Sequence, residues 1–192
     1  MAAVQEAPKA AEKAKGKETI KVTVCLSLSG LAEGGMEVYK EFEKHLTELK
    51  EDVELGEKKH CSLGQVGCRG YCSRDVLVDL FIGEERFTYE KVKPAMVKDI
   101  IKGHIVGGKP YAKAASKKDY YELIGKQQRV ALEFGGIIDP ENIEEYLEVG
   151  GYSSLKHVLK TYKPKEVIEE IKKSGLRGKG GGGFLTALKW EI

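Results

Sequence analysis

The apolar residues of this chain recur with two different periods. Over residues 20–26, IKVTVCL, every second residue is apolar, which predicts a β-strand with one buried face. The segment 76–83, VLVDLFIG, is apolar nearly throughout and predicts a buried strand. Two more strands are predicted over 58–66 and over 86–92, the latter joined to VLVDLFIG by an acidic turn.

Two segments carry apolar residues at helical spacing. Residues 35–51 predict one helix. A second is predicted to begin at Pro94, because the fixed φ of proline suits a first helical position, and to end at Gly107 and Gly108. The residues predicted to face inward are Met36, Tyr39, Phe42, Leu46 and Leu49, then Met96, Val97, Ile100 and Ile101. The order strand, helix, strand, hairpin, helix predicts an α/β domain over 19–108 with a thioredoxin-like order of elements.

After this domain the pattern becomes polar and then helical. Residues 109–130 are rich in lysine and predict a linker, and a short strand is predicted within 129–140, RVALEFGGIIDP. Three helices are expected next, with starts at Asp139–Pro140, Ser153 and Pro164 and with Gly175 just past the third. Residues 186–190 predict the first turn of a further helix.

Composition and charge narrow the classes of protein. The 192 residues are 41% hydrophobic and 32% charged, with a net charge of +2, which favours a soluble globular protein and gives no general case for nucleic-acid binding. No run of about 18 apolar residues is present, so no transmembrane helix is predicted. Residues 1–18 lack the apolar core of a secretory signal and lack arginine, so we expect a disordered tail and a cytoplasmic protein.

The four cysteines suggest metal chemistry or free thiols. They are Cys25, Cys61, Cys68 and Cys72. Without a secretory signal, structural disulfides are not expected. Cys25 closes the first strand, and Cys68 and Cys72 form a C-x3-C pair after the second, where a thioredoxin-like order places the two loops side by side. Thiolates gathered there could hold an iron–sulfur cluster, which usually takes four protein ligands. A zinc site and an ordinary buried role for Cys25 are the alternatives.

The segment RGKGGGGF, residues 177–184, is called the glycine loop below. It contains G-x-G-x-x-G, but a helix precedes it where a dinucleotide fingerprint requires a strand, and it lacks the Ser or Thr of a Walker A loop. Residues without side chains let backbone N–H groups turn toward an anion and let a flat ring approach the backbone. A flexible glycine linker is the alternative, which the apolar residues around the loop disfavour.

These segments carry a family resemblance. VTVCLSLSGLAEGGMEVYKEFEKHL and GQVGCRGYCSRDVLV resemble the N-terminal thioredoxin-like [2Fe–2S] domain of NADH-binding flavoprotein subunits. Such subunits occur in complex I relatives, in NAD-linked and electron-bifurcating hydrogenases and in formate dehydrogenases. SGLRGKGGGGFLTALKW is similar to their signature SGLRGRGGAGFPTGLKW, and the resemblance covers residues 19–192.

The resemblance implies cofactor sites. The positions implied to bind FMN and NAD(H) are Gly178, Lys179, Gly180, Gly181, Gly182, Gly183, Phe184, Leu185, Thr186, Ala187 and Lys189. The departures from the signature are Lys179, Gly182, Leu185 and Ala187. For a [2Fe–2S] cluster the implied metal ligands are Cys25, Cys68 and Cys72, whereas the second family cysteine falls on Gly30. Cys61, or an oxygen of Ser27 or Ser29, could stand in for it, or the domain has kept its fold and lost its cluster.

The resemblance also implies a function. It predicts a thioredoxin-like [2Fe–2S] ferredoxin domain followed, over 131–192, by the mostly helical and incomplete start of an FMN/NADH-binding domain. We expect an electron-transfer subunit of an NADH:acceptor oxidoreductase, in which hydride passes from NADH to FMN and single electrons pass to iron–sulfur clusters. Its partners would be other subunits of a redox complex, either in the cytoplasm or at the periphery of a membrane, and a [4Fe–4S] cluster is implied only if the chain continues. The alternatives are a non-catalytic docking subunit with a degenerate cluster site and a free-standing ferredoxin-like carrier. No catalytic residue is assigned.

Overall fold

The computed structural model describes residues 18–51 and 58–192. The chain divides into two compact units, Met1–Tyr146 and Leu147–Ile192, which are described separately. The predicted tail lies outside the described residues except for Glu18, which begins the first strand.

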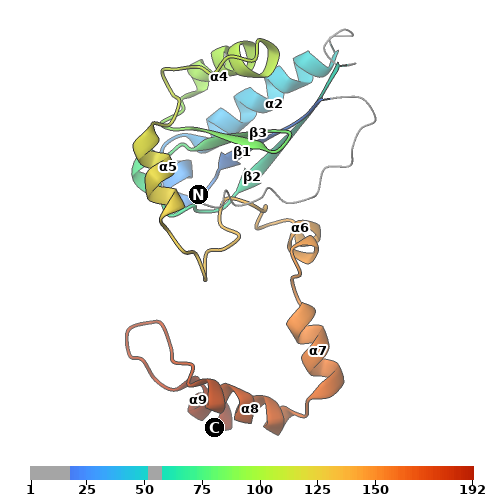
Figure 1. Ribbon diagram of the computed structural model, residues 1–192, viewed down its shortest axis with the longest axis vertical. Coiled ribbons are helices and arrows are strands. Elements are labelled where there is room, and N and C mark those ends of the chain that lie inside the picture. Colours follow the sequence, from blue (N-terminus) through green and yellow to red (C-terminus); the bar gives the residue numbers. More distant parts are fainter. Residues whose placement is uncertain (1–17, 52–57) are drawn as a thin grey trace. The chain divides into compact units, whose positions relative to one another are not determined.

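The first unit is built on a four-stranded sheet of order β2-β1-β3-β4 (Figure 1). The strands are β1 (Glu18–Cys25), β2 (Lys59–Val66), β3 (Val78–Ile82) and β4 (Glu85–Tyr89). Strand β1 is parallel to β2 and antiparallel to β3, and β3 is antiparallel to β4. This order with these directions is the thioredoxin-like arrangement, so the predicted fold class and the four predicted strands are confirmed.

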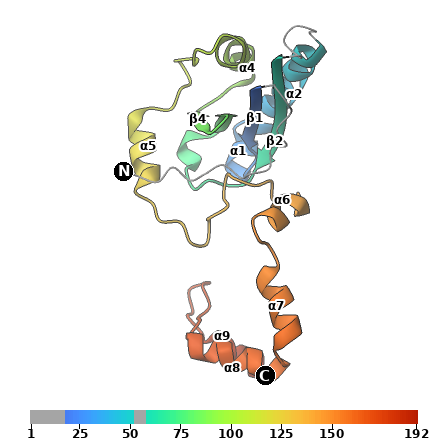
Figure 2. The same ribbon diagram turned by 45° about the vertical axis from the view of Figure 1, so that its right-hand side comes forward.

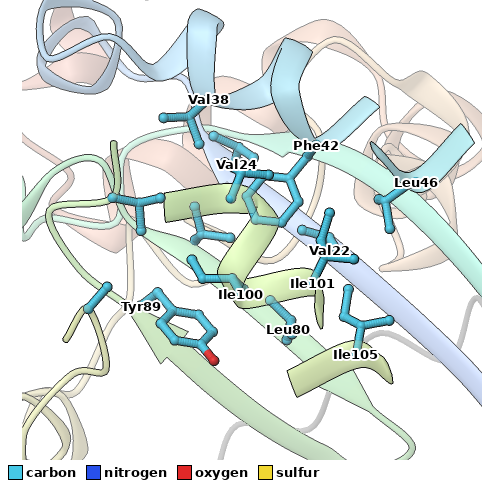
Figure 3. Close-up of a cluster of buried hydrophobic side chains, with 14 of the residues drawn as sticks. Val22, Val24, Val38, Phe42, Leu46, Leu80, Tyr89, Ile100, Ile101 and Ile105 are labelled. Carbon is cyan, nitrogen blue, oxygen red and sulfur yellow. The ribbon is translucent and has the colours of Figure 1, made fainter. Parts of the chain in front are cut away.

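Two helices cover one face of the sheet. They are α2 (Gly35–Glu51) and α4 (Pro94–Ile100), and α4 continues as a π-helical segment, Ile101–Val106 (Figure 1). Between these helices and the sheet lies the hydrophobic core, to which β1 contributes alternate residues (Figure 3). Ile20, Val22 and Val24 are all fully buried, as their period of two predicts.

The inner face of α2 differs in one respect from the prediction. Phe42 and Leu46 are buried as expected, but Met36 is 38% exposed and Val38 is fully buried in the core. The buried positions therefore advance by four residues along the helix, which places them in one row facing the sheet. The prediction for Met36 is wrong because the first turn of α2 presents Val38, rather than Met36, to β1.

Residues 109–130, predicted as a linker, contain the helix α5 (Lys118–Gly125). This helix packs against β4, where the backbone N–H of Thr88 donates to the Tyr121 hydroxyl over 3.1 Å, and Tyr120 is buried. Residues 129–140, predicted to hold a short strand, form turns instead. The turn includes Gly136 at φ +75°, where a Cβ would lie 2.2 Å from Cγ of Arg69, so tertiary packing decides its conformation.

The helices near and within the second unit follow the predicted pattern. They are α6 (Ile143–Glu148), which spans the boundary between the units, α7 (Ser153–Thr161), α8 (Pro164–Ser174) and α9 (Thr186–Glu191). Helix α6 begins later than predicted because Asp139–Pro140 forms a turn. Gly175 caps α8 in the left-handed conformation, at φ +65°. Among the helices that the structure describes, none has both the length and the apolar composition of a membrane span.

Candidate functional site

The loops that follow β1 and β2 lie side by side, as the thioredoxin-like order predicts. The loop after β1 contains the short helix α1 (Leu28–Ala32), and the loop after β2 leads into the 3-10 turn η1 (Cys72–Arg74) (Figure 2). Ser29 Oγ donates to the backbone carbonyl of Cys72 over 3.3 Å, and the Cys25 thiol lies 3.8 Å from the carbonyl oxygen of Gly67. The cysteine loops are therefore neighbours in the folded chain.

Cys68 and Cys72, the cysteine pair, are both exposed. Their sulfur atoms lie 3.6 Å apart, and the backbone N–H of Gly70 donates to Cys68 Sγ over 3.3 Å. The hydrogen bond to Cys68, with a smaller contribution from burial, raises the pKa of the Cys72 thiol. Two accessible sulfur atoms thus face each other across a tight loop.

Cys25 is in a different environment from the cysteine pair. It is 1% exposed, and its thiol donates to Ser27 Oγ over 3.4 Å. Burial raises the pKa of this thiol, which disfavours the thiolate form that binds metals. Within residues 18–51 and 58–192, no three side chains of Cys, His, Asp or Glu form a group able to hold a metal ion.

The residues expected to stand in for a fourth thiolate ligand, at the position of Gly30, have other roles. Cys61 is buried on β2, where it pairs with Ile20. It lies five residues before Val66, the last residue of β2, from which the chain leads to Cys68. At the usual rise of a strand, Cys61 and Val66 are about 17 Å apart. The Ser27 hydroxyl accepts from the backbone N–H of Gly30 and caps α1. Ser29 donates to a backbone carbonyl, as described above.

Gly30 itself excludes a larger side chain. It is buried in α1, and a Cβ built there would lie 2.2 Å from the backbone oxygen of Cys25. A cysteine at this position therefore requires the loop to shift. Together with the burial of Cys25, this means that the residues present do not fit a cluster held by four thiolates.

Gly30→Cys is accordingly expected to destabilise the first unit by about 1–3 kcal/mol, the usual cost of forcing atoms into a packed site. Urea unfolding monitored by circular dichroism would measure the change. Gly64→Cys is the matched control for adding a thiol, because a Cβ at Gly64 makes only ordinary contacts, at 3.7 and 3.9 Å, and its φ is not positive. Unchanged stability of Gly30→Cys, with iron bound after reconstitution, would contradict the steric argument.

A buried polar network lies next to residues 68–72, which are called the cysteine loop below. Arg69, between the two cysteines, is 3% exposed and forms an ion pair with the fully buried Asp79 on β3, at 2.8 Å. Arg86 pairs with the same carboxylate at 2.7 Å, Thr88 Oγ1 donates to it over 2.6 Å, and Arg69 also donates to the Tyr120 hydroxyl. Sequence reasoning missed this network, although an aspartate inside the apolar strand VLVDLFIG was a usable signal.

The second unit presents the glycine loop as an ordered hairpin with a closed base. The backbone N–H of Gly178 donates to the Phe184 carbonyl over 2.8 Å, and that of Thr186 donates to the Leu176 carbonyl over 2.9 Å. The Arg177 guanidinium donates to the Gly183 carbonyl over 3.0 Å. Three contacts therefore fix the base and side of the loop, which is inconsistent with a structureless linker.

The glycines at the tip are open to the outside of the unit. Gly181 and Gly183 have φ values of +109° and +59°, where side chains other than glycine are strained. A Cβ at Gly180 or at Gly182 would meet nothing within 4 Å, and neither residue has a positive φ. Nothing in the described chain therefore requires glycine at Gly180 or Gly182.

The remaining predicted loop positions are divided between surface and interior. Phe184 is 58% exposed, Lys179 and Lys189 are exposed, and Ala187 is 3% exposed at the start of α9. Leu185 forms an isolated bridge with Arg177 rather than a rigid turn. Lys172 of α8 and Glu191 of α9 form an ion pair at 2.9 Å between the two helices that precede and follow the loop.

The fold and the loop define a thioredoxin-like α/β unit joined to a helical unit with an open glycine loop. No family model matches the chain. NADP-reducing hydrogenase subunit HndC of Solidesulfovibrio fructosivorans is 51% identical over 67 residues, 35% of this chain and 14% of that protein. An NADH-quinone oxidoreductase subunit of Buchnera aphidicola subsp. Schizaphis graminum is 56% identical over 50 residues, 26% of this chain and 11% of that protein. The subunit of the same name in Aquifex aeolicus is 48% identical over 51 residues, 27% of this chain and 12% of that protein.

The predicted resemblance to subunits of NADH-quinone oxidoreductases and of such hydrogenases is confirmed within these matched residues. The chain spans between 11% and 14% of the length of the three relatives. Among solved structures, the thioredoxin-like [2Fe–2S] ferredoxin of Aquifex aeolicus is similar at 23% identity and a TM-score of 0.44, covering 53% of this chain and 99% of that one.

Proposed function

We propose that this chain is part of an electron-transfer subunit of an NADH:acceptor oxidoreductase, with the glycine loop at its flavin and nucleotide site. Similarity to subunits of NADH-quinone oxidoreductase and of an NADP-reducing hydrogenase supports the proposal. FMN, when bound, accepts hydride from NADH and releases single electrons. The other subunits of such a complex would be the partners of this chain, and iron–sulfur clusters held elsewhere would receive the electrons.

One observation carries the proposal for the loop. Gly180 needs glycine neither for its backbone conformation nor for packing within the described chain. The absence of a side chain at Gly180 is explained by a ligand that approaches the backbone there. A flat ring or a phosphate fits this description, because open backbone N–H groups donate to anions and a bare backbone admits a ring.

The side chains around the loop have distinct parts in this proposal. The Arg177 guanidinium donates to the Gly183 carbonyl at the side of the loop. Arg177 therefore stabilises the conformation of the loop, and its side chain does not occupy the tip. Lys179 projects from an exposed position and supplies positive charge for a phosphate. Phe184, exposed at the end of the loop, offers an apolar surface that excludes water from one side of a bound ring.

A pair of alanine substitutions tests the loop. The signature of the family carries alanine at the position of Gly182, so we expect Gly182→Ala to retain flavin. We expect Gly180→Ala to weaken flavin binding by about tenfold, or about 1.4 kcal/mol. Flavin per chain, measured by fluorescence after release from the intact complex, is the readout. Because both positions are equally open in the chain alone, a purely structural role for the loop predicts the same small effect for both.

A second function is favoured by the geometry at Gly30 and Cys25. A chain whose thioredoxin-like unit cannot assemble four thiolates from its described residues could serve as a non-catalytic docking subunit of the same kind of complex. This alternative predicts that both alanine variants, and removal of the whole tip of the loop, leave the flavin content and the NADH oxidation rate of the complex unchanged. Loss of flavin in Gly180→Ala alone would exclude it.

A further inference from the structure

The cysteine pair can perform a chemistry that needs neither Cys25 nor a fourth ligand. Its sulfur atoms are 3.6 Å apart, and both side chains are exposed. A disulfide brings two sulfur atoms to about 2.05 Å, so a small rotation of the side chains within the loop is sufficient. The other two cysteines are buried and do not compete for a reagent in solution.

The backbone of this loop is anchored at both ends. Next to Cys68, the Arg69 guanidinium is bound to Asp79, and the Arg69 carbonyl accepts from Arg129 over 2.7 Å. The Cys72 carbonyl accepts from Ser29 over 3.3 Å, and two residues later Arg74 pairs with Glu90 at 2.6 Å. The anchors hold the backbone while leaving the two sulfur atoms free to move toward each other.

We propose that Cys68 and Cys72 form a reversible dithiol–disulfide pair that exchanges with small-molecule disulfides such as oxidised glutathione. Cys68 is the attacking sulfur, because the backbone N–H of Gly70 donates to it over 3.3 Å and so fixes its position in the loop. The pair goes beyond the proposed function, since its chemistry does not depend on flavin or NADH. A disulfide that forms and breaks by thiol exchange is transient or redox-sensing rather than structural, which is the role assigned to this pair.

The exchange proceeds in two balanced steps. The Cys68 thiolate attacks one sulfur of the glutathione disulfide, whose S–S bond breaks, so that a mixed disulfide forms and one glutathione leaves as the thiol. The Cys72 thiolate then attacks Cys68 Sγ and expels the second glutathione. The protein loses two protons and two electrons, and the small-molecule disulfide gains them as two thiols.

The experiment uses the whole chain, reduced and then incubated with oxidised glutathione, followed by alkylation, tryptic cleavage and mass spectrometry. Cleavage after Arg69 separates Cys68 from Cys72, so the disulfide joins two peptides that are otherwise free. Cys61 lies in the same tryptic peptide as Cys68, so persistence of the link in Cys61→Ser is what assigns it to Cys68. We expect this link in the wild type and in Cys25→Ser and Cys61→Ser. In Cys72→Ser we expect glutathione to accumulate on Cys68, on the order of a hundredfold above the wild type, because the fast intramolecular step is lost.

Two results would overturn the inference. One is a wild type in which glutathione stays on both cysteines, or in which the new link involves Cys25 or Cys61. The other is a chain that carries iron when purified anaerobically from its source, with both thiols protected from alkylation until the iron is removed. Loss of flavin in the glycine-loop variants bears on the proposed function alone and leaves this result unaffected.

Discussion

Asp79→Ala is expected to lower the free energy of unfolding of the first unit by about 3–5 kcal/mol, the usual cost of removing one partner of a buried ion pair. Asp79 is fully buried and forms ion pairs with Arg69 and Arg86 at 2.8 and 2.7 Å. Its removal leaves the Arg69 guanidinium buried without a counter-charge. Because Arg69 lies between Cys68 and Cys72, the loss also loosens the cysteine loop. Urea unfolding at neutral pH measures the change.

The control for this prediction is Asp119→Ala. Asp119 pairs with Arg74 at 3.3 Å, but its side chain is 61% exposed, so we expect a loss below about 1 kcal/mol. Equal effects of the two substitutions would contradict the claim that burial, rather than the ion pair as such, makes Asp79 important.

The pH dependence of stability gives a second test at the same residue. Burial raises the pKa of the Asp79 carboxyl. The charges of Arg69 and Arg86 and the hydrogen bonds lower this pKa by more than burial raises it, so the net pKa is below its usual value. A carboxyl whose pKa is depressed by folding stabilises the native state above its unfolded pKa of about 3.9 and loses that stabilisation as the pH falls toward the folded pKa. We expect the stability of Asp79→Asn to fall less steeply than that of the wild type below about pH 4.

Phe42→Ala is expected to destabilise the first unit by about 3–5 kcal/mol, the range for deleting a buried aromatic ring. Phe42 is 0% exposed and lies in the middle of the core between α2 and the sheet (Figure 3). The cavity left behind is bounded by strand and helix residues that are themselves packed, so little collapse can offset the loss. Chemical unfolding of the whole chain measures the effect.

Met36→Ala on the same helix is the matched control. Met36 is 38% exposed, so its truncation is expected to cost less than about 1 kcal/mol. The sequence pattern alone placed both residues on the inner face and therefore predicts comparable costs. A large effect at Met36 would show that the pattern describes the helix better than the structure does.

Much of the sheet could be predicted from local patterns, because the residues of β1 alternate strictly and the segment that contains β3 is apolar nearly throughout. Ile20, Val22 and Val24 face the core, and the same alternation places Thr23 and Cys25 on the opposite face. The parallel pairing of β1 with β2 then brings the two cysteine loops together, as a thioredoxin-like order requires. Regular local patterns and simple topology were sufficient for this part of the fold and of the site.

Other features depend on contacts that a single sequence does not reveal. The turn at Gly135–Gly136 replaces a predicted strand because it packs against Arg69, a residue far away in the chain. The Cys25 thiol lies against the Gly67 carbonyl, 42 residues away in the chain, and the exclusion of a side chain at Gly30 depends on the Cys25 carbonyl. The run of glycines in the sequence predicts the glycine loop. The hydrogen bonds that close its base and the open surroundings of its tip depend on the folded structure.

The most direct test of the proposed function is the absorption spectrum of the intact complex purified anaerobically through this chain, recorded before and after addition of NADH. The proposal predicts a bound flavin whose visible absorption is bleached by NADH and restored by an electron acceptor. A complex without flavin, or with a spectrum that NADH does not change, would contradict the proposal and leave the docking function as the better description of this chain.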